Sequence, residues 1–325
     1  VLGSRGLGDV YKRQIYMYKG ARMTDHNMNK GGYGRISVEQ AIWYSSNIGV
    51  AKTILKGYSD NPTKFVEGLY RIGMNADLRL EIPGAGRAKI RRPDDTTRYW
   101  SKTTLPWMSF GYETQVPPIN TLAFFNAIAN NGKMVRPMFT KEILHNGKTV
   151  QSFSTEVINS SICSDHTLAL IKDMLLGVVE KGTGKAVHSD IVRIAGKTGT
   201  AQITDARSRE GRYYLGSMVA YFPADNPRYT VLTTIETRAQ PGKAYYGGPL
   251  AGPVVKRMVD YIYNRNRDWY GRVERHGGRC YPGHVKGGDI AQIRRVADKF
   301  SPRASFDQRT GWGRARVDSL SNVIA

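Results

Sequence analysis

Three strand-like runs that follow one another closely constrain the fold of this chain more than any other feature. They span residues 191–203, 215–222 and 229–236. The last two are joined by Pro-Ala-Asp-Asn-Pro-Arg, a composition typical of a turn. Consecutive strands with such short connections usually pair in opposite directions. The sequence therefore predicts an antiparallel sheet in this part of the chain.

Helices are predicted before and after this sheet, because side chains recur at helical spacing in four stretches. The recurring residues are Val38, Ala41, Ile42, Ser45 and Ile48; Leu122, Phe125, Ile128 and Ala129, with Gly132 placed to end the helix; Leu168, Ile171, Met174, Leu175 and Val178; and Val254, Val255, Met258, Val259 and Ile262. We therefore expect a domain of mixed α and β structure over residues 15–264.

The two ends of the chain differ from this middle part. Residues 1–14 show no amphipathic period, and their Asp-Val-Tyr-Lys-Arg-Gln is also what a sequencing-library adapter encodes in one frame. We expect them to be a read-through segment that is foreign to the natural protein. Residues 265–325 carry 13 Lys and Arg against 6 Asp and Glu. They are expected to form a basic appendage or linker rather than a second core.

Charge and length narrow the classes of function. The formal net charge of the 325 residues is +21. The basic residues are spread along the chain, and no nucleic-acid reading module is visible, which argues against a nucleic-acid partner. A basic surface also suits anionic lipid or an anionic wall polymer. No apolar run reaches the roughly 18 residues that a membrane-spanning helix needs.

Metal and disulfide chemistry are not expected either. Two cysteines, Cys163 and Cys280, are too few for a disulfide framework or a cysteine-based zinc site. Five of the six histidines, taken as candidate ligands, show no metal-ligand spacing, and a solvated or core role is expected for each. They are His26, His166, His188, His276 and His284. We expect no cofactor and no metal.

Two short motifs carry the chemical signal. Lys197-Thr198-Gly199-Thr200 lies in the first strand run, where an edge strand with a solvated lysine would also explain it. Ser45-Ser46-Asn47 gives Ser-x-Asn, which accompanies Lys-Thr-Gly in penicillin-binding proteins and class A β-lactamases. Serine and asparagine are also ordinary cap residues, so a buried serine at a helix end remains the alternative for Ser45.

Longer blocks around these motifs occur in the order of a known family. They are DHN, GYGRISVEQAIWYSSNIGVAK, SFGYETQVPPINTLAFFNAIANNGKMVRP, VVEKGTGKAV, IAGKTGTAQ and YYGGPLAGPVVKRM. With them, residues 15–262 resemble the transpeptidase domain of class B penicillin-binding proteins of the cell-division type. One departure is Glu113, where relatives often have glycine after Phe-Gly-Tyr.

This resemblance implies a fold and an activity. The fold is α+β, an α/β/α sandwich with an antiparallel sheet plus a helical subdomain, here a partial penicillin-binding transpeptidase or β-lactamase-like fold. The activity is serine acyl transfer from D-alanyl-D-alanine, which cross-links peptidoglycan stem peptides, with β-lactams as suicide acylators. The parent protein is expected on the outer, periplasmic face of a bacterial cytoplasmic membrane. Its expected partners are a septal glycosyltransferase and other divisome proteins.

The residue types fit the roles that this reaction requires. Lys197 offers a positive charge for the terminal carboxylate of the stem peptide, and the hydroxyls of Thr198 and Thr200 can donate to the same group. Gly199 lets the substrate backbone approach the strand edge closely. By resemblance, the backbone N–H of Thr200 is an oxyanion-hole donor.

The other motif supplies the remaining roles by resemblance. Ser45 would relay a proton to the leaving amine, and Asn47 would hold the catalytic lysine and the substrate amide. The family's nucleophile and base lie in Ser-x-x-Lys, several tens of residues upstream of Ser-x-Asn. No serine of this chain is followed by lysine three positions later. We expect that the nucleophile has been cut off and that the chain by itself is inactive.

Two glycine-containing segments invite other interpretations. Gly182-Thr183-Gly184 lacks the flanking residues of a P-loop and precedes a strand, so we expect a loop that shapes the cleft. Residues 245–248, Tyr-Tyr-Gly-Gly, are expected to be a loop beside the sheet.

Two alternative functions remain open at this point. The first is a β-lactam hydrolase or sensor on the same fold, which differs in how fast water attacks the acyl-enzyme. The second is a non-catalytic module whose basic appendage binds wall polymer or protein partners.

Overall fold

The computed structural model describes residues 15–97, 99–203 and 211–266, with short pieces at 10–11, 288–289, 291, 295, 312–313, 316–317 and 323–324. The chain divides into two compact units, Val1–Arg265 and Asn266–Ala325. In the second unit, β14 (Gly288–Asp289) pairs with β15 (Trp312–Gly313), and β16 (Arg316–Val317) pairs with β17 (Val323–Ile324). The division lies one residue after the expected start of the appendage.

The predicted antiparallel sheet is present in the first unit. Its order is β11 (Ala195–Ile203), β12 (Tyr213–Phe222) and β13 (Tyr229–Arg238), with both pairs antiparallel. Strand β11 begins at Ala195 instead of residue 191. Among the described residues β11 pairs on one side only, with β12, so the Lys-Thr-Gly motif lies on an edge strand.

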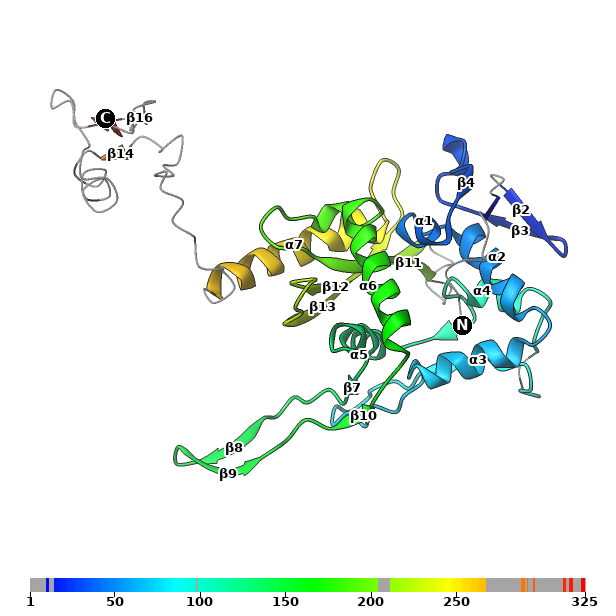
Figure 1. Cartoon of the computed structure of the whole chain (residues 1–325), viewed down its shortest axis with the longest axis horizontal. Helices are drawn as coiled ribbons and strands as arrows, with labels where there is room; N and C mark the ends of the chain where they lie inside the picture. Colours follow the sequence, from blue (N-terminus) through cyan, green and yellow to red (C-terminus); the bar gives the residue numbers. More distant parts are fainter. Residues whose placement is uncertain are drawn as a thin grey trace. The chain divides into compact units, whose positions relative to one another are not determined.

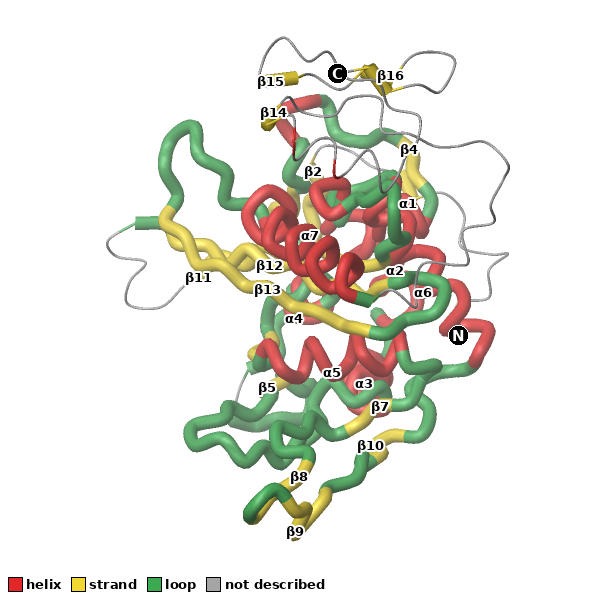
Figure 2. The backbone as a smooth tube through the Cα atoms, turned by 90° about the vertical axis from the view of Figure 1, so that its left-hand side faces the viewer, coloured by secondary structure: helices red, strands yellow, loops and turns green. Residues whose placement is uncertain are grey.

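Helices cover both faces of this sheet, as the resemblance implied. Helix α7 (Gly247–Arg265) packs across all three strands on one face. On the other face lie α5 (Pro118–Ala129), against β12 and β13, and α6 (Asp165–Glu180), against β11. Figure 2 shows α7 on one side of the strands and α5 on the opposite side.

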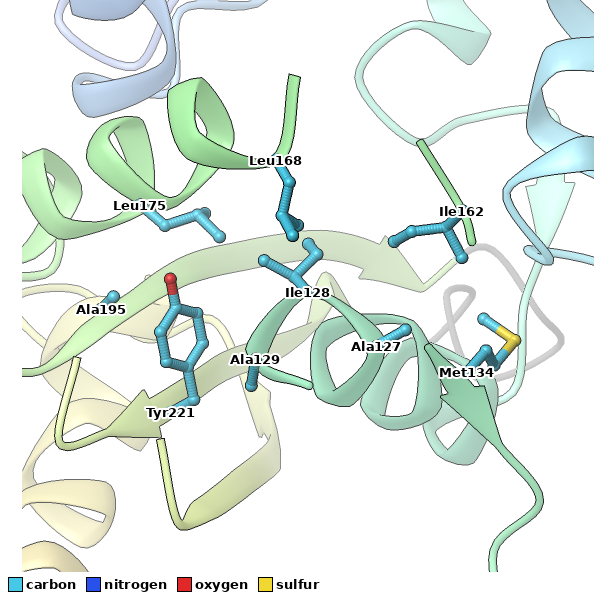
Figure 3. Packing of buried hydrophobic residues seen from close by; sticks show 9 residues of the cluster. All are labelled: Ala127, Ile128, Ala129, Met134, Ile162, Leu168, Leu175, Ala195 and Tyr221. Atoms are coloured by element: carbon cyan, nitrogen blue, oxygen red, sulfur yellow. The ribbon is translucent and has the colours of Figure 1, made fainter. Parts of the chain in front are cut away.

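The main apolar core lies between the sheet and the helix pair α5 and α6 (Figure 3). Apolar side chains from both helices meet those of β11 and β12 there. The buried members are Ala127, Ile128, Ala129, Met134, Ile162, Leu168, Leu175, Ala195 and Tyr221. Burying each large aliphatic side chain contributes about 1.5–3 kcal/mol, so this core anchors the edge strand that carries Lys197.

The prediction of one helix from Val38 to Ile48 was wrong, because two helices occur there. Helix α1 (Val38–Trp43) is closed at its start by a capping box of Ser37 and Gln40. The chain then turns, and α2 (Asn47–Tyr58) begins. Helix α1 packs against α6, and α2 packs against α4 (Thr104–Met108). The helical spacing nevertheless continues through the turn, so the apolar pattern does not reveal the break.

Short elements make up the rest of the first unit; some lie beside the helical region of α1 and α2, whereas others, such as the hairpin over residues 142–152, lie far from it (Figure 1). The hairpin β2 (Ile15–Tyr18) and β3 (Ala21–Thr24) precedes it. The others are β1 (Val10–Tyr11) paired with β4 (Arg35–Ile36), η1 (Met28–Lys30), α3 (Pro62–Arg71), β5 (Lys89–Ile90) paired with β6 (Thr114–Gln115), α4 (Thr104–Met108), β7 (Met134–Val135) paired with β10 (Val157–Asn159), β8 (Glu142–His145) paired with β9 (Lys148–Ser152), and η2 (Lys185–Val187). Within the described part of the chain, none of the helices combines the length and apolarity of a membrane span.

Candidate active site

The two short motifs meet at the edge of the sheet. The Nζ atom of Lys197 donates hydrogen bonds to Oγ of Ser45 at 2.8 Å and to the carbonyl oxygen of Thr198 at 2.8 Å. Ser45 lies in the turn between α1 and α2, whereas Lys197 lies on β11. The fold therefore brings together residues that are 152 positions apart in the sequence.

Lys197 is not the solvated edge-strand lysine of the alternative interpretation. Its side chain is half-buried, and desolvation lowers the pKa of Lys197 from 10.5 to about 8. The cause is desolvation, which disfavours the charged form of an amine. At neutral pH the group is still mostly protonated, so it can hold an anion. A pKa near the working pH also suits a group that gives up and regains a proton.

Ser45 has an unusual backbone conformation. Its φ angle is +53°, in the left-handed region that a helix C-terminus usually fills with glycine. The N–H of Ser45 bonds to the carbonyl of Ile42, and the N–H of Ser46 bonds to the carbonyl of Ala41. These two bonds form a Schellman motif that ends α1. A serine in this conformation costs about 1–3 kcal/mol, and it directs the Ser45 hydroxyl toward Lys197.

The alternative interpretation of Ser45 as a buried serine at a helix end applies to its neighbour Ser46, whereas Ser45 is only half-buried. Ser46 is fully buried and accepts a hydrogen bond from the N–H of Gly49, which caps α2. Its hydroxyl donates to Oδ2 of Asp25, and the N–H of Ile48 donates to Oδ1 of the same carboxylate. Asp25 is only 4% exposed. It anchors the start of α2 immediately after the Ser45 turn.

The role of Asp25 was missed by the sequence analysis. The residue stands in the DHN block, which was used only as part of the resemblance. The sequence shows only an acidic residue at this position. Its hydrogen-bond partner Ser46 lies 21 positions away, so the local sequence does not indicate that Asp25 is buried and bonded. A carboxylate at a helix N-terminus satisfies free N–H groups and interacts favourably with the helix dipole.

The remaining predicted residues have other hydrogen-bond partners. Asn47 is the first residue of α2, and its Nδ2 donates to the carbonyl of Thr24 on β3 at 3.1 Å. The hydroxyls of Thr198 and Thr183 lie 2.7 Å apart. Oγ1 of exposed Thr200 accepts a bond from the N–H of Gly247 at 3.0 Å. A hydroxyl also has a donor proton, so this bond is compatible with donation from Thr200 to a ligand.

Glycines allow close contact between β11 and the start of α7. A Cβ atom on Gly247 would clash with the carbonyl of Gly199, and one on Gly199 would clash with Oγ of Ser217. The segment 245–248 was predicted to be a loop, but Gly247 and Gly248 already belong to α7. The first turn of this helix lies directly on β11 and β12.

A chain of aromatic rings borders the same region and was not predicted. It links the Ser45 turn to the residues before α7 through edge and stacking contacts, with centroid distances from 4.4 to 6.1 Å. Its members in order are Tyr44, Tyr33, His26, Tyr246, Tyr245 and Tyr214. The hydrogen bond between the Tyr245 and Tyr246 hydroxyls, 3.1 Å apart, is the main cause that raises the pKa of Tyr246 to about 12.

Comparison with known proteins places these features in a family. A sequence profile described as penicillin binding protein transpeptidase domain matches residues 8–260. Its first residues fall inside the segment 1–14 that was expected to be foreign.

In the part of the chain that the structure describes, no group of three or more His, Cys, Asp or Glu residues could hold a metal ion.

Curated relatives carry transpeptidase names. The chain is 27% identical over 237 residues to a probable peptidoglycan D,D-transpeptidase PenA of Neisseria flavescens, covering 71% of this chain and 53% of that protein. It is 25% identical to a peptidoglycan D,D-transpeptidase FtsI homolog of Mesostigma viride, covering 70% and 39%. It is 26% identical to stage V sporulation protein D of Bacillus subtilis, covering 71% and 34%. The chain thus spans about a third to a half of their length.

Solved structures share the fold. Penicillin-binding protein 3 of Mycobacterium tuberculosis superposes with a TM-score of 0.66 at 20% identity, covering 80% of this chain and 57% of that one. The transpeptidase domain of Burkholderia pseudomallei penicillin-binding protein 3 gives 0.59 at 23% identity, covering 79% and 70%. With the matched profile and the curated relatives, this chain belongs to the penicillin-binding protein transpeptidase family, as a class B transpeptidase domain.

Proposed function

We propose that this chain holds the substrate-binding part of a serine-type site that cross-links peptidoglycan stem peptides. The single observation that carries the proposal is the 2.8 Å hydrogen bond between Lys197 and Ser45. It puts a cation and a hydroxyl side by side at a strand edge that no other described strand pairs with, where an extended peptide can lie. The family itself comprises peptidoglycan D,D-transpeptidase domains.

The roles follow from the donors and acceptors at this edge. The ammonium of Lys197 binds the terminal carboxylate of D-alanyl-D-alanine, and the exposed hydroxyl of Thr200 donates to the same group. The backbone N–H of Thr200 stabilises the oxyanion as it forms. Gly199 keeps the strand edge clear for the substrate backbone. A β-lactam carries a similar carboxylate and would bind to the same residues.

Ser45 is suited to passing a proton to the leaving amine. Because Lys197 donates to Oγ of Ser45, the proton of the Ser45 hydroxyl is directed elsewhere, toward the substrate. When this proton moves to the nitrogen of the departing D-alanine, Ser45 regains one from Nζ of Lys197. The lowered pKa of Lys197, about 8, favours that second transfer. Asn47 would orient the substrate amide from the start of α2.

The chain by itself is proposed to be inactive in acyl transfer. A serine nucleophile needs a base within hydrogen-bond reach, which the family supplies through Ser-x-x-Lys. None of the serines in the 325 residues has lysine at that spacing. The whole protein is proposed to act on the outer face of the bacterial cytoplasmic membrane, with a septal glycosyltransferase and other divisome proteins. The relatives named FtsI homolog and stage V sporulation protein D support that assignment.

Equilibrium binding of a short peptide tests the proposed carboxylate site without requiring catalysis. One peptide ends in D-alanyl-D-alanine with a free carboxylate, and its partner ends in the C-terminal amide. We expect the free acid to bind at least about tenfold more tightly, and Lys197→Met to remove that preference, because a charge-assisted bond contributes about 1.5–3 kcal/mol.

Lys243→Met is the matched control, because Lys243 is exposed in the segment before α7. This variant changes the net charge by the same amount and should keep the preference for the free acid. Equal binding of acid and amide by the unchanged chain would contradict the proposed role of Lys197. In a longer protein that contains Ser-x-x-Lys, rapid loss of the acyl group to water would indicate a β-lactam hydrolase instead.

A further inference from the structure

The loop Gly182-Thr183-Gly184 contacts both the end of α1 and strand β11, the two segments on either side of the Lys197–Ser45 pair. It connects the end of α6 to η2. The N–H of Thr183 donates to the carbonyl of Trp43 at 3.0 Å, and the Thr183 and Thr198 hydroxyls lie 2.7 Å apart. Trp43 is two residues before Ser45, and Thr198 is next to Lys197. One residue is therefore bonded to both segments that supply the Lys197–Ser45 pair.

The loop has almost no room to move. A Cβ atom on Gly182 would clash with the Trp43 carbonyl, and one on Gly248 would lie 2.8 Å from the Thr183 carbonyl. Trp43 is held in turn, because its indole occupies the space left by Gly177 and Nζ of Lys181 lies 4.8 Å from its ring centroid. Thr183 is thus wedged between the end of α1 and the start of α7.

We infer that Thr183 is a positioning residue, whose hydroxyl holds β11 at the distance from the Ser45 turn that lets Lys197 reach Ser45. The inference rests on the proposed function, because it takes Lys197 and Ser45 as parts of the site. Its backbone N–H fixes the α1 end, and its hydroxyl fixes the strand. Packing alone would not need the hydroxyl, since a methyl group fills the same volume.

The test measures the burial of Lys197 and needs no catalysis. Competitive acetylation of the folded 325-residue chain with trace acetic anhydride, read peptide by peptide in a mass spectrometer, gives the titration midpoint of each lysine. We expect partial burial to lower the midpoint of Lys197 below that of an exposed lysine in the unchanged chain. Thr183→Val should raise it by at least about half a pH unit, because a loosened strand admits water to the ammonium.

Two variants separate the hydroxyl bond from general packing. Thr183→Ser keeps the hydroxyl and should leave the Lys197 midpoint unchanged. Thr167→Val removes a hydroxyl that lies 3.0 Å from the Ser164 hydroxyl at the far end of α6, and should also leave it unchanged. A shift of the same size in either variant would overturn the inference, as would no shift in Thr183→Val.

A second variant, Thr198→Val, covers the case in which Thr183→Val does not fold. Thr198→Val breaks the same bond from the strand side, and an unchanged Lys197 midpoint in that variant overturns the inference. Where both single variants fold, the double variant should shift the midpoint no further than either one. Additive shifts would mean that the two hydroxyls act separately. Peptide binding by Lys197→Met is a different measurement, so failure of the proposed function can be distinguished from failure of this one.

Discussion

Nζ of Lys197 lies 2.8 Å from Oγ of Ser45, and this contact joins the edge strand of the sheet to the turn between two helices. For both residues this contact is accompanied by an unfavourable contribution to the free energy of folding. The lysine is partly taken out of water, which lowers its pKa to about 8, and the serine adopts a φ of +53°. Costs of this kind persist where the surrounding structure imposes them, and they are common at functional sites.

Replacing the lysine should damage acylation while leaving the fold intact. In a longer protein that contains the Ser-x-x-Lys segment, Lys197→Ala should slow acylation by penicillin by at least about two orders of magnitude. The variant loses both the proposed anchor for the substrate carboxylate and the hydrogen-bond partner of Ser45. Stopped-flow acylation rates measure the effect, with circular dichroism as the check on folding. Unchanged rates in a folded variant would remove Lys197 from the site.

The backbone strain at Ser45 can be measured with a pair of variants. Ser45→Ala and Ser45→Gly both remove the hydroxyl, but only glycine relieves the left-handed conformation. We expect Ser45→Gly to be more stable than Ser45→Ala by about 0.5–1 kcal/mol, after the greater freedom of glycine in the unfolded chain is subtracted. Urea unfolding of both variants gives the difference. A more stable alanine variant would show that this turn is not strained.

The stability of the chain should depend on pH through Lys197. Burial lowers the pKa of Lys197 from 10.5 to about 8, so between these values the unfolded chain binds the proton that the folded chain has released. Stability from this residue should therefore rise with pH across that window. Other groups titrate there too, so the quantity to measure is the free energy of unfolding of the unchanged chain minus that of Lys197→Met. A difference that stays level or falls between pH 8 and 10.5 would contradict the burial of Lys197.

Asp25 should stabilise the start of α2, next to the Ser45 turn. Asp25→Asn keeps the shape but leaves either the Ser46 hydroxyl or the Ile48 N–H without its acceptor. We expect a loss of about 1–3 kcal/mol in unfolding free energy. Asp60→Asn is the control, because Asp60 is exposed beyond the end of α2 and should change stability by less than about 0.5 kcal/mol. Equal losses in the two variants would mean that the Asp25 bonds contribute little.

The parts of this structure that sequence predicted are those governed by local pattern. Strand-like runs with turn composition between them predicted β11, β12 and β13, and helical spacing predicted α5, α6 and α7. These signals lie within a few residues of one another, so they can be read without knowing the fold. Even there, the start of α7 was missed, since only contact with the strands reveals why Gly247 and Gly248 are helical.

The parts that sequence could not predict depend on distant partners. The helix break at Ser45 is set by backbone bonds that leave the apolar period intact. Asp25 acquires its role from Ser46, 21 positions away, and Thr183 acquires its role from Trp43 and Thr198. The family resemblance predicted that Ser45 and Lys197 belong to one site, but it did not predict the hydrogen bonds that position them. The appendage beyond residue 265 lies mostly outside the described residues.

The most direct test of the central claim is to incubate the purified chain with fluorescent penicillin. The claim is that the chain holds the Lys-Thr-Gly and Ser-x-Asn half of a transpeptidase site and no activated nucleophile. A denaturing gel and an intact mass then report any covalent adduct. We expect none, because in the proposed site the Ser45 hydroxyl relays a proton, and the neighbouring Lys197 is mostly protonated at neutral pH and so cannot act as the base that a nucleophile needs. A stoichiometric adduct that Ser45→Ala abolishes would contradict it, since Ser45 would then be acting as the nucleophile with Lys197 as its base.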